Sequence, residues 1–600
     1  MSEFHAPLAD MRFVIEALIG YDAIAALDGC AMVGPDLVSP ILEEAARFAT
    51  GVLAPLNAAG DRVGACIENG VVRTPPGFAQ AYAAFTEAGW NGLAADPAFG
   101  GQGLPAVLAA PVEEMWHGAN MAFGLCPLLT RGAIHALEVC ASEDQKARYL
   151  PRLIAGTWTG TMNLTEPQAG SDLAAVQARA VPDPDGKGWR IHGTKIFITY
   201  GDHDMAENIV HLVLARLPDA PAGVKGISLF VVPKFLIDTD GNPGARNDLR
   251  CVSIEHKLGI HASPTAVMAY GDGPGALGEL VGEPNRGLEA MFKMMNLARF
   301  SVGMEGVAIG ERAFRQALAY AETRVQGSDV ADPRGPRVAI IRHPDVRRML
   351  MTMKAETEAA RALAYVAAYQ MDVAARHPDA AARAHAQGVA DLLIPLVKGC
   401  GTEAALRTAS LGVQVHGGMG FIEETGAAQH YRDARILTIY EGTTGIQAND
   451  LLGRKILRDG GAVARAVSAD IAATAFALQD DAELAPIGAA LGRAAVMLDQ
   501  ALDWVLATHP IDPRATAASA GPLLDLFGIV AGGWQMGRAA LAATTRLRAG
   551  AHPDRGFLRA KLGTARFHAD HILSRADGLA HTIRAGAAGT LALAEADFAR

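Results

Sequence analysis

Hydrophobic residues recur at helical spacing over the first quarter of the chain. The segments 43–53, 78–88 and 107–115 mix Ala, Leu and Glu in a way that is typical of helices. Ser142 precedes two acidic residues, and its hydroxyl can accept hydrogen bonds from the first backbone N–H groups of another helix. We therefore predict a helical N-terminal domain over residues 1–158.

The pattern changes to short runs of β-branched residues after Thr157. Four runs have this character, at 188–191, 196–199, 209–214 and 227–232, with turn-forming residues between them. No helix long enough for a βαβ crossover separates the runs, which favours antiparallel pairing. Residues 159–283 are therefore predicted to form a middle, antiparallel β domain.

Helical spacing returns near Gly287. We assign 284–458 to a helical-bundle domain and the Ala-rich residues 459–600 to an extra helical C-terminal extension. A run of charge, Pro and Gly at 328–337 is predicted to be a surface loop between two helices. The apolar stretch 521–543 contains an aspartate and several glycines, so we interpret it as a buried helix pair rather than a membrane span. The fold class is thus α+β.

Composition and charge narrow the choice of function. A chain of 600 residues exceeds the size of one hydrophobic core, which supports several domains. The net charge of -11 argues against a general phosphate-binding surface, and so against nucleic acid as a partner. The cysteines form no CxxC pair and the N-terminus has no signal-peptide pattern, so we expect reduced thiols in a cytoplasmic protein. No metal site is expected, because no His or Cys group has ligand spacing.

Two segments of the β domain carry residues suited to a flat ligand. In 162–172, Gly and Pro fix a tight loop, while Thr165 and Ser171 supply hydroxyl groups. The second segment, 195–199, has the pattern of a strand. Taken alone, the first segment is better explained as an ordinary turn and the second simply as a strand.

Two further segments lie in the second helical domain. Three glycines follow Gln414 within six residues, and they would let a ligand approach the backbone or simply end a helix. Glu441 precedes Gly442 and a pair of threonines, one of which can cap the next helix. A carboxylate there would complement the helix dipole. Without other evidence, that interpretation is stronger than catalysis.

Taken in order, the four segments resemble the acyl-CoA dehydrogenase family. The segment 254–263 looks like the KLG…S stretch of that family's β domain, and 287–299 looks like the opening of its second helical domain. The resemblance runs from about residue 95 to 457, and both extensions are similar to those of large bacterial members. Among these, the layout most resembles 3-methylmercaptopropionyl-CoA dehydrogenase-like proteins. The resemblance implies FAD as cofactor and oxidation of an acyl-CoA thioester to a trans-2-enoyl-CoA.

The resemblance also assigns the FAD-binding residues. The loop ending at Ser171 would line the flavin ring, with a hydrogen bond from Thr165, and Phe197 would lie on the other flavin face. Arg324 would reach the FAD pyrophosphate of a neighbouring subunit, since a guanidinium pairs with phosphate through two N–H groups. Gln414 and the glycines after it would cover the adenosine side across a subunit interface. The complete set is Met162, Leu164, Thr165, Gly170, Ser171, Phe197, Ile198, Thr199, Arg324, Gln414, Gly417, Gly418 and Thr443.

By resemblance, Glu441 is the general base that removes the α-proton. Some relatives carry the base on an earlier helix, but the matching residue here is Ala298, which cannot take a proton. Substrate contacts are assigned to Ser171, Asn296, Arg299 and Gly442. The chain departs from the family pattern at Phe197 (often Trp), Asn296 (often Asp), Gly445 (usually Gln) and after Arg324, where Val-Gln-Gly replaces Lys-Thr-Phe-Gly.

Partners and substrate follow from the same resemblance. We expect an electron-transferring flavoprotein as electron acceptor, and at least a homodimer, because the family's FAD contacts cross subunits. An acyl-CoA oxidase and a non-catalytic flavin- and CoA-binding protein stay open as alternatives, although the intact segment from Tyr440 to Gly442 argues against the second. The acyl group stays open among 3-methylthiopropionyl and shorter or longer fatty acyl groups, with a role in fatty acid β-oxidation.

Overall fold

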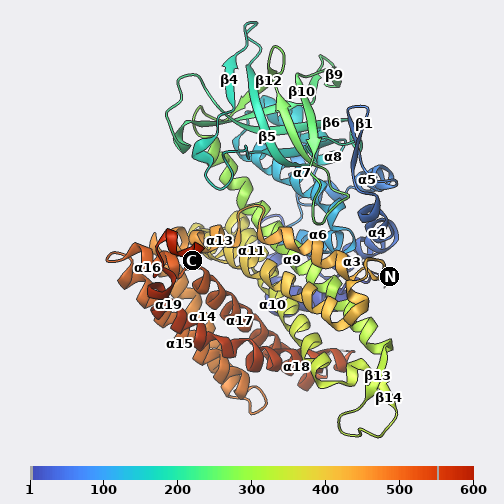
Figure 1. Ribbon diagram of the computed structural model, residues 1–600, viewed down its shortest axis with the longest axis vertical. Coiled ribbons are helices and arrows are strands. Elements are labelled where there is room, and N and C mark those ends of the chain that lie inside the picture. The colour runs from blue at the N-terminus through green and yellow to red at the C-terminus, as the bar shows by residue number, and fades with distance from the viewer. Residues whose placement is uncertain (1–3, 551–552) are drawn as a thin grey trace. The chain divides into compact units, whose positions relative to one another are not determined.

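The structure, a computed structural model, describes residues 4–550 and 553–600 (Figure 1). The chain forms two compact units, which are described separately. The β unit consists of Arg47–Pro105 and Met115–Ser301. The helical unit consists of Met1–Ala46, Ala106–Glu114 and Val302–Arg600.

The helices predicted at 43–53, 78–88, 107–115 and after Ser142 lie within a longer series of helices. The helices of this region are α1 (Leu8–Phe13), α2 (Tyr21–Ala25), α3 (Pro35–Phe48), α4 (Ala54–Val63), α5 (Phe78–Glu87), α6 (Ala106–Ala119), α7 (Met121–Cys140) and α8 (Glu143–Ala155), with π-helical turns at Val14–Ile19 and Ala49–Leu53. Ser142 caps α8 as predicted: its hydroxyl accepts the Gln145 N–H at 3.2 Å. The Gln145 side chain accepts the Ser142 N–H at 3.1 Å in return, which completes a capping box.

The β unit contains an eight-stranded sheet and two short hairpins. The strands of the sheet are β3 (Trp158–Asn163), β4 (Arg179–Pro182), β5 (Trp189–Thr199), β6 (Asn208–Arg216), β7 (Ile227–Pro233), β10 (Leu249–Ile254), β11 (Thr265–Tyr270) and β12 (Ala276–Val281). The hairpins pair β1 (Cys66–Glu68) with β2 (Val71–Arg73) and β8 (Phe235–Ile237) with β9 (Pro243–Arg246). The strand order is β10-β11-β5-β12-β7-β6-β3, and β4 pairs with β5 and β6.

The pairing differs from the prediction in two places. The sheet is antiparallel except where β3, and one residue of β4, run parallel to β6. No crossover helix is needed there, because β4 and β5 occupy the chain between β3 and β6. The predicted strands 188–191 and 196–199 are one strand, β5, whose apolar pattern is interrupted by Gly193 and polar neighbours. An added Cβ at Gly193 would lie 2.9 Å from Ala178, the residue before β4, so glycine lets the start of β4 approach β5.

Both faces of the central strands are buried. In β6, Val210, Leu212 and Leu214 pack into a core with α7 and α8, whereas Val213 and Ala215 belong to a second core on the other face. Successive side chains of a strand point to opposite faces. The run therefore appears almost continuously apolar in the sequence, which indicates a strand covered on both sides.

The helical unit is built from long helices. Its helices beyond residue 301 are the rest of α9 (Gly287–Thr323), α10 (Pro344–Arg376), α11 (Ala380–His416), α12 (Ala427–Ala434), α13 (Thr444–Asp450), α14 (Ala462–Gln479), α15 (Ala485–Thr508), α16 (Pro513–Ala518), α17 (Ala520–Ala549), α18 (Arg555–His571), α19 (Ala576–Ala585) and α20 (Ala587–Thr590). The predicted surface loop at 328–337 lies within a hairpin of β13 (Val325–Ser328) and β14 (Arg337–Ala339).

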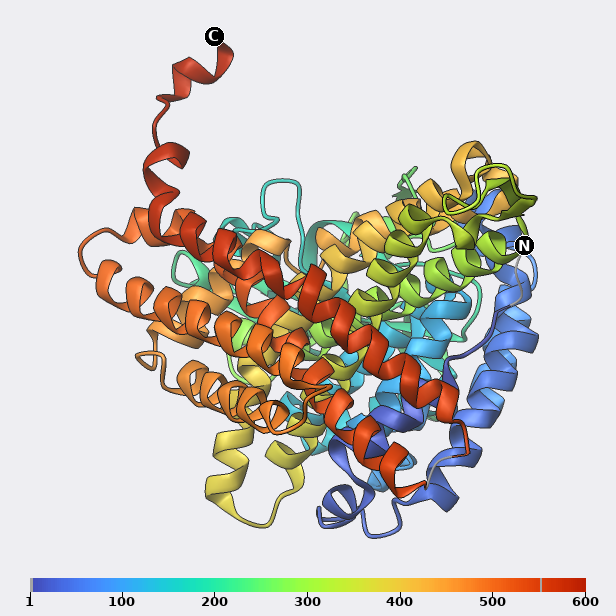
Figure 2. The same cartoon turned by 90° about the horizontal axis from the view of Figure 1, so that it is seen from below.

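Two helices of the C-terminal extension pack against the bundle (Figures 1 and 2). α17 contacts α10 and α11, and α18 contacts α10. The stretch 521–543 is one buried helix, α17, and not the predicted pair, because its glycines serve close packing rather than a turn. An added Cβ at Gly528 would lie 2.2 Å from Cys400 Sγ. In the described ranges, no single helix is long and apolar enough to cross a membrane. Only the pair Thr444–Leu457 and Ala462–Gln479 has that length and composition together, and the pair is bent by 96°.

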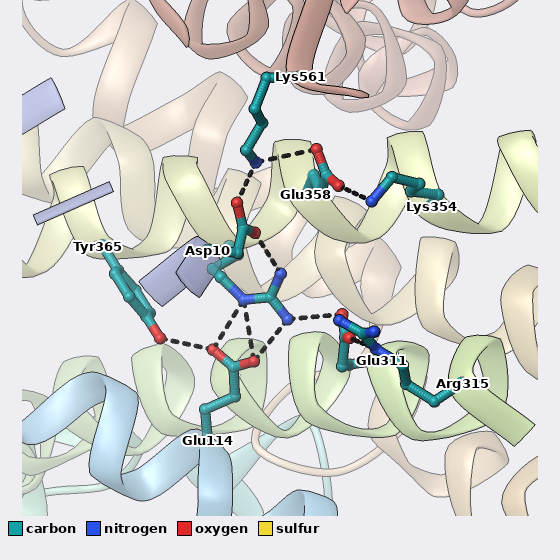
Figure 3. Close-up of polar contacts among 9 residues, drawn as sticks. Asp10, Glu114, Glu311, Arg315, Lys354, Glu358, Tyr365 and Lys561 are labelled. Atoms are coloured by element: carbon teal, nitrogen blue, oxygen red, sulfur yellow. Dashed lines mark hydrogen bonds and ion pairs between the residues drawn. The ribbon is translucent and has the colours of Figure 1, made fainter. Parts of the chain in front are cut away.

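A buried set of charged residues joins distant parts of the helical unit (Figure 3). Arg361 of α10 donates to three carboxylates at 2.6 to 2.8 Å, those of Asp10, Glu114 and Glu311. Lys561 of α18 contacts Asp10 and, at 2.9 Å, Glu358. These residues, with Arg315, Lys354 and Tyr365, are named the Arg361 cluster. The cluster ties α1 and the C-terminal extension to the bundle.

Candidate active site

A buried ion pair pins the loop that follows β3 in the β unit. Glu166 accepts hydrogen bonds from Lys195 Nζ at 2.8 Å and from the backbone N–H groups of Gln177 and Ala178 at 2.7 and 3.0 Å. Burial opposes the charge on Glu166, but Lys195 and these N–H groups hold its pKa below the ordinary value. Burial lowers the pKa of Lys195 to about 8, so both groups are charged at neutral pH.

The same loop is hydrogen-bonded to β5 through its backbone. Lys195 Nζ donates to Leu164 O at 3.1 Å, and the Ile196 N–H donates to Thr165 O at 2.9 Å. These bonds bring the two predicted flavin segments of the β unit together. Within them, Met162 and Ile198 are buried, Leu164, Thr165 and Thr199 are partly buried, and Gly170 and Ser171 are exposed.

Phe197 combines a strained backbone with an exposed ring. Its φ is 60°, and 58% of the residue is exposed. It lies at the bulge where the register of β5 against β11 shifts, between Lys195 and Ile198. Bulky residues rarely adopt a positive φ, and such strain gathers at functional sites. An exposed aromatic surface held in this way suits a flat ligand.

The predicted substrate residues of α9 lie in its β-unit portion. Arg299 is buried and Asn296, three residues earlier on the same helical face, is partly buried. Ala298 is also buried, at 2% exposure, and offers no group that takes a proton. The alternative position considered for the base therefore holds no acid.

In the helical unit, Glu441 lies in a loop with left-handed backbone, which we name the Glu441 loop (residues 438–444). The φ of Glu441 is 52° and that of Gly442 is 89°. Gln447 Nε2 donates to the carbonyl oxygens of Glu441 and Gly442 at 3.3 and 3.2 Å. Lys398 Nζ of α11 donates to Gly442 O at 2.6 Å. The loop is thus fixed in a conformation that costs an L-residue about 1–2 kcal/mol.

The ends of the Glu441 loop are also anchored. The Tyr440 hydroxyl donates to Glu305 of α9. Thr443 caps α13, as one of the two threonines was predicted to do, by accepting the Ile446 N–H at 3.2 Å. Thr444 Oγ1 donates to Glu403 at 2.8 Å. Glu441 itself is partly buried, so it is neither sealed in the bundle nor fully open to solvent.

The remaining predicted FAD residues of the helical unit are at its surface. Arg324 is exposed directly after α9, and Gln414 is exposed in the last turn of α11. Gly417 has a φ of 61° and ends α11, so the helix-terminator interpretation is correct for it. An added Cβ at Gly417 or Gly418 would meet no atom within 4 Å, so the backbone there is also open to a ligand.

Sequence reasoning missed the residues that support these loops. Glu305 and Lys398 are completely buried, and Glu166 is nearly so. Glu305 is the lone charged residue of the run 300–310, and Lys398 is the lone charged residue of 392–402. A single charge in an apolar helical run signals a buried polar partner, because an uncompensated charge is costly to bury.

The residues present fit a bound flavin. Phe197 offers an exposed aromatic surface beside a rigid hydroxyl-bearing loop. The open glycines after α11 would admit close backbone contact with the adenosine part, and exposed Arg324 supplies a guanidinium of the kind that pairs with pyrophosphate. The β unit thus offers residues suited to the flavin ring, and the helical unit offers residues suited to the adenosine and pyrophosphate parts.

Comparison with known families and proteins also points to a flavin-binding enzyme of the acyl-CoA dehydrogenase type. Four family descriptions match in order: "Acyl-CoA dehydrogenase, N-terminal domain" at 39–157, "middle domain" at 161–272, "C-terminal domain" at 285–456, and "Acetyl-CoA dehydrogenase C-terminal like" at 464–594. The chain is 53% identical over 577 residues to a 3-methylmercaptopropionyl-CoA dehydrogenase of Ruegeria pomeroyi, covering 95% of this chain and 96% of that protein.

Two further proteins show how far the similarity extends. A broad-specificity linear acyl-CoA dehydrogenase of Mycobacterium tuberculosis is 36% identical, covering 96% of each chain. The solved structure of an acyl-CoA dehydrogenase from Bacillus anthracis, complexed with FAD, has a TM-score of 0.74 at 21% identity and covers 95% of this chain and 91% of that chain. The predicted fold class and cofactor are confirmed. The chain belongs to the acyl-CoA dehydrogenase family of FAD-dependent enzymes.

Proposed function

We propose that this enzyme oxidises acyl-CoA thioesters with Glu441 as the catalytic base. The Glu441 carboxylate takes the proton from the carbon next to the thioester carbonyl. The β C–H bond breaks with its electron pair leaving as hydride, and a trans double bond forms between the two carbons. Bound FAD supplies the acceptor for that hydride. One proton and one hydride thus leave the substrate as its carbon–carbon bond becomes double.

The backbone at Glu441 is the observation that supports this assignment most. A base must be held within hydrogen-bond reach of the proton that it removes. The left-handed Glu441–Gly442 pair is held by Lys398 and Gln447, and the side chain of Glu441 remains partly exposed. A carboxylate that only complemented the dipole of α13 would need neither the strained backbone nor these two donors.

The other predicted residues complete the proposal. The backbone N–H of Glu441 would help to stabilise the enolate-like oxygen of the thioester. Thr165, Phe197 and Thr199 would position the flavin ring, and Arg324 its pyrophosphate. Ser171, Asn296, Arg299 and Gly442 would contact the CoA thioester. The remaining residues of the FAD set would contribute mainly backbone groups.

The substrate is proposed from the relatives. The similarity to a 3-methylmercaptopropionyl-CoA dehydrogenase over nearly the whole chain supports 3-methylthiopropionyl-CoA as the substrate. The similarity to a linear acyl-CoA dehydrogenase supports fatty acyl-CoA, and with it a role in β-oxidation, as the second candidate. We further propose a cytoplasmic homodimer that passes its electrons to an electron-transferring flavoprotein.

Glu441→Gln tests the base assignment. This change keeps the shape of the side chain but removes its ability to accept a proton. We expect FAD-loaded protein whose anaerobic flavin bleaching by substrate is about 10²–10⁴ times slower than that of the unchanged enzyme. Bleaching within threefold of the unchanged rate would mean that another group removes the proton.

A panel of thioesters tests the substrate. The unchanged enzyme should bleach fastest with 3-methylthiopropionyl-CoA, and butyryl- and octanoyl-CoA are the comparison compounds. A higher kcat/KM for either fatty acyl thioester would favour the second candidate. Release of peroxide under air, at the rate of substrate oxidation, would instead identify an oxidase.

A further inference from the structure

Glu305 is a buried acid directly behind the Glu441 loop. It lies on the helical-unit part of α9 and is completely buried. Its carboxylate accepts the hydroxyl hydrogen of Tyr440, the residue that precedes Glu441. Burial, and then the neighbouring Glu305 and Glu441 carboxylates, raise the pKa of Tyr440 well above its ordinary value. The hydroxyl therefore stays protonated and acts as the donor.

Close helix packing places Glu305 against the core of the bundle. An added Cβ at Gly303 would lie 2.4 Å from Val397 Cγ1, and one at Gly306 would lie 3.0 Å from Gly401 O. The glycines on either side of Glu305 therefore let α9 approach the segment of α11 that carries Lys398. Glu305 is completely buried beside this close contact, which limits the freedom of its carboxylate to move away from Tyr440.

Three helices then hold three consecutive residues. Glu305 of α9 holds the Tyr440 side chain, Gln447 of α13 holds the Glu441 carbonyl, and Lys398 of α11 holds the Gly442 carbonyl. Gln447 and Lys398 act on the carbonyl side of Glu441. The contact with Glu305 fixes its amino side. The N–H groups of Ile439 and Tyr440 also donate to Ile436 O on this side, at 2.9 and 3.1 Å, and the contact with Glu305 adds a tie to another helix.

We propose that Glu305 is a positioning residue, which fixes Glu441 in its left-handed conformation through the hydrogen bond from Tyr440. Glu305 is not an alternative base, because its side chain is buried whereas Glu441 is partly exposed. The inference rests on the proposed role of Glu441. It goes further by making the rate depend on a residue that touches neither substrate nor flavin.

A double-mutant cycle tests the inference. The variants are Tyr440→Phe, which removes the donor, Glu305→Leu, which removes the acceptor, and the double variant. Tyr440→Phe should slow anaerobic flavin reduction about 10- to 100-fold, since small misplacements of a catalytic group have effects of this size. Its apparent substrate KM should stay within about threefold. The double variant should be no more than about threefold slower than the slower single variant, because both changes break one bond.

Two further variants serve as controls. Glu305→Gln keeps a neutral acceptor of the same shape, so its rate should lie between those of the unchanged enzyme and Glu305→Leu. Tyr369→Phe removes another partly buried hydroxyl of the helical unit, which donates to Ala23 O at 3.4 Å, and should leave the rate within about twofold. If Glu305→Leu does not fold, Glu305→Gln takes its place in the cycle.

Several results would overturn the inference. Effects of Tyr440→Phe and Glu305→Leu that multiply in the double variant would show independent roles, and a Tyr440→Phe rate within twofold of the unchanged rate would show none. A crystal structure of Tyr440→Phe gives a readout besides activity: residue 441 should leave the left-handed region or occupy more than one position. An unchanged, single conformation would refute positioning even if the rate fell.

The test also separates this inference from the base assignment. Glu441→Gln alone decides whether Glu441 removes the proton. If that variant stays active, the proposed function fails. The conformation of residue 441 in the Tyr440→Phe crystal still reports whether Glu305 holds the turn, because that readout does not depend on which group takes the proton.

Discussion

The Arg361 cluster and the Glu441 loop both place charged groups among the packed helices of the helical unit. In the cluster, the charged side chains belong to regular helices, α1, α6, α9, α10 and α18, and four carboxylates face four cationic groups (Figure 3). In the loop, the buried side chains of Glu305 and Lys398 contact a hydroxyl and a carbonyl oxygen of an irregular segment. The same kind of group thus serves two different purposes.

The pKa shifts in the cluster reflect this arrangement. Burial opposes the charge of Asp10, but Lys561 and Arg361 hold its pKa below the ordinary range. Burial also opposes the charge of Glu311, whose pKa is held below the ordinary range by Arg361 and Arg315. Burial raises the pKa of Glu114 in spite of its contact with Arg361. Balanced charges of this kind hold helices together. The loop instead uses buried polar side chains to hold a strained backbone in place.

Removing the central cation should have the largest effect on stability. Arg361→Met leaves the carboxylates of Asp10, Glu114 and Glu311 buried without their shared donor, and breaking a buried ion pair in this way costs about 3–5 kcal/mol. Urea unfolding followed by circular dichroism measures the loss. Activity per folded, FAD-loaded molecule should stay within about twofold, because the cluster holds helices rather than the Glu441 loop.

Lys354→Met is the matched control for this change. Lys354 also pairs with a carboxylate of the cluster, that of Glu358, but its side chain is 28% exposed. A partly solvated pair contributes about 0–1 kcal/mol, so the control should be far milder. Equal losses in the two variants would show that burial of Arg361 is not what makes the cluster important.

The two regions also differ in how well the sequence predicts them. Local signals in the sequence, a glycine after Glu441 and a threonine cap, mark the Glu441 loop, whereas the role of Glu441 as base comes from the family resemblance. The Arg361 cluster was not found, since its members lie up to 551 positions apart and join only when the helices pack. The prediction of a helix pair at 521–543 was wrong for a related reason. Whether a glycine ends a helix or lets another helix approach depends on the residues packed against it, which the local sequence does not show.

Adding one methyl group at Gly442 should disturb the strained Glu441 loop while leaving the rest of the fold unchanged. Gly442 has a φ of 89°, and an added Cβ would lie 2.9 Å from Gln447 Nε2, which holds two carbonyls of the loop. Gly442→Ala should introduce about 1–3 kcal/mol of local strain. We expect this to appear mainly as a flavin-reduction rate about tenfold lower, with the unfolding midpoint little changed.

Gly445→Ala is the control for that variant. Gly445 lies in the first turn of α13, is exposed, and an added Cβ would approach nothing closer than Thr443 Oγ1, at 3.7 Å. Its rate and stability should match those of the unchanged enzyme. If Gly442→Ala lowered the unfolding midpoint as much as the rate, the loop would be a structural element like the cluster, and the contrast between them would fail.

The smallest expected effect is the response of the cluster to alkaline pH. Burial opposes the charge on Lys561, but the Asp10 and Glu358 carboxylates raise its pKa above the ordinary value. A raised pKa in the folded state means that the ammonium contributes stability in full below its unfolded pKa of about 10.4, and that this contribution is lost as pH rises through the folded value. The difference in unfolding free energy between the unchanged enzyme and Lys561→Met should therefore be constant to about pH 10 and then shrink, by about 1.4 kcal/mol for each unit by which the pKa is raised.

Subtracting the unfolding free energy of the variant removes the titration of the other lysines and tyrosines. A difference that stayed constant through this range would mean that the carboxylates do not stabilise the ammonium, and that the charges of the cluster are not what joins α18 to the bundle.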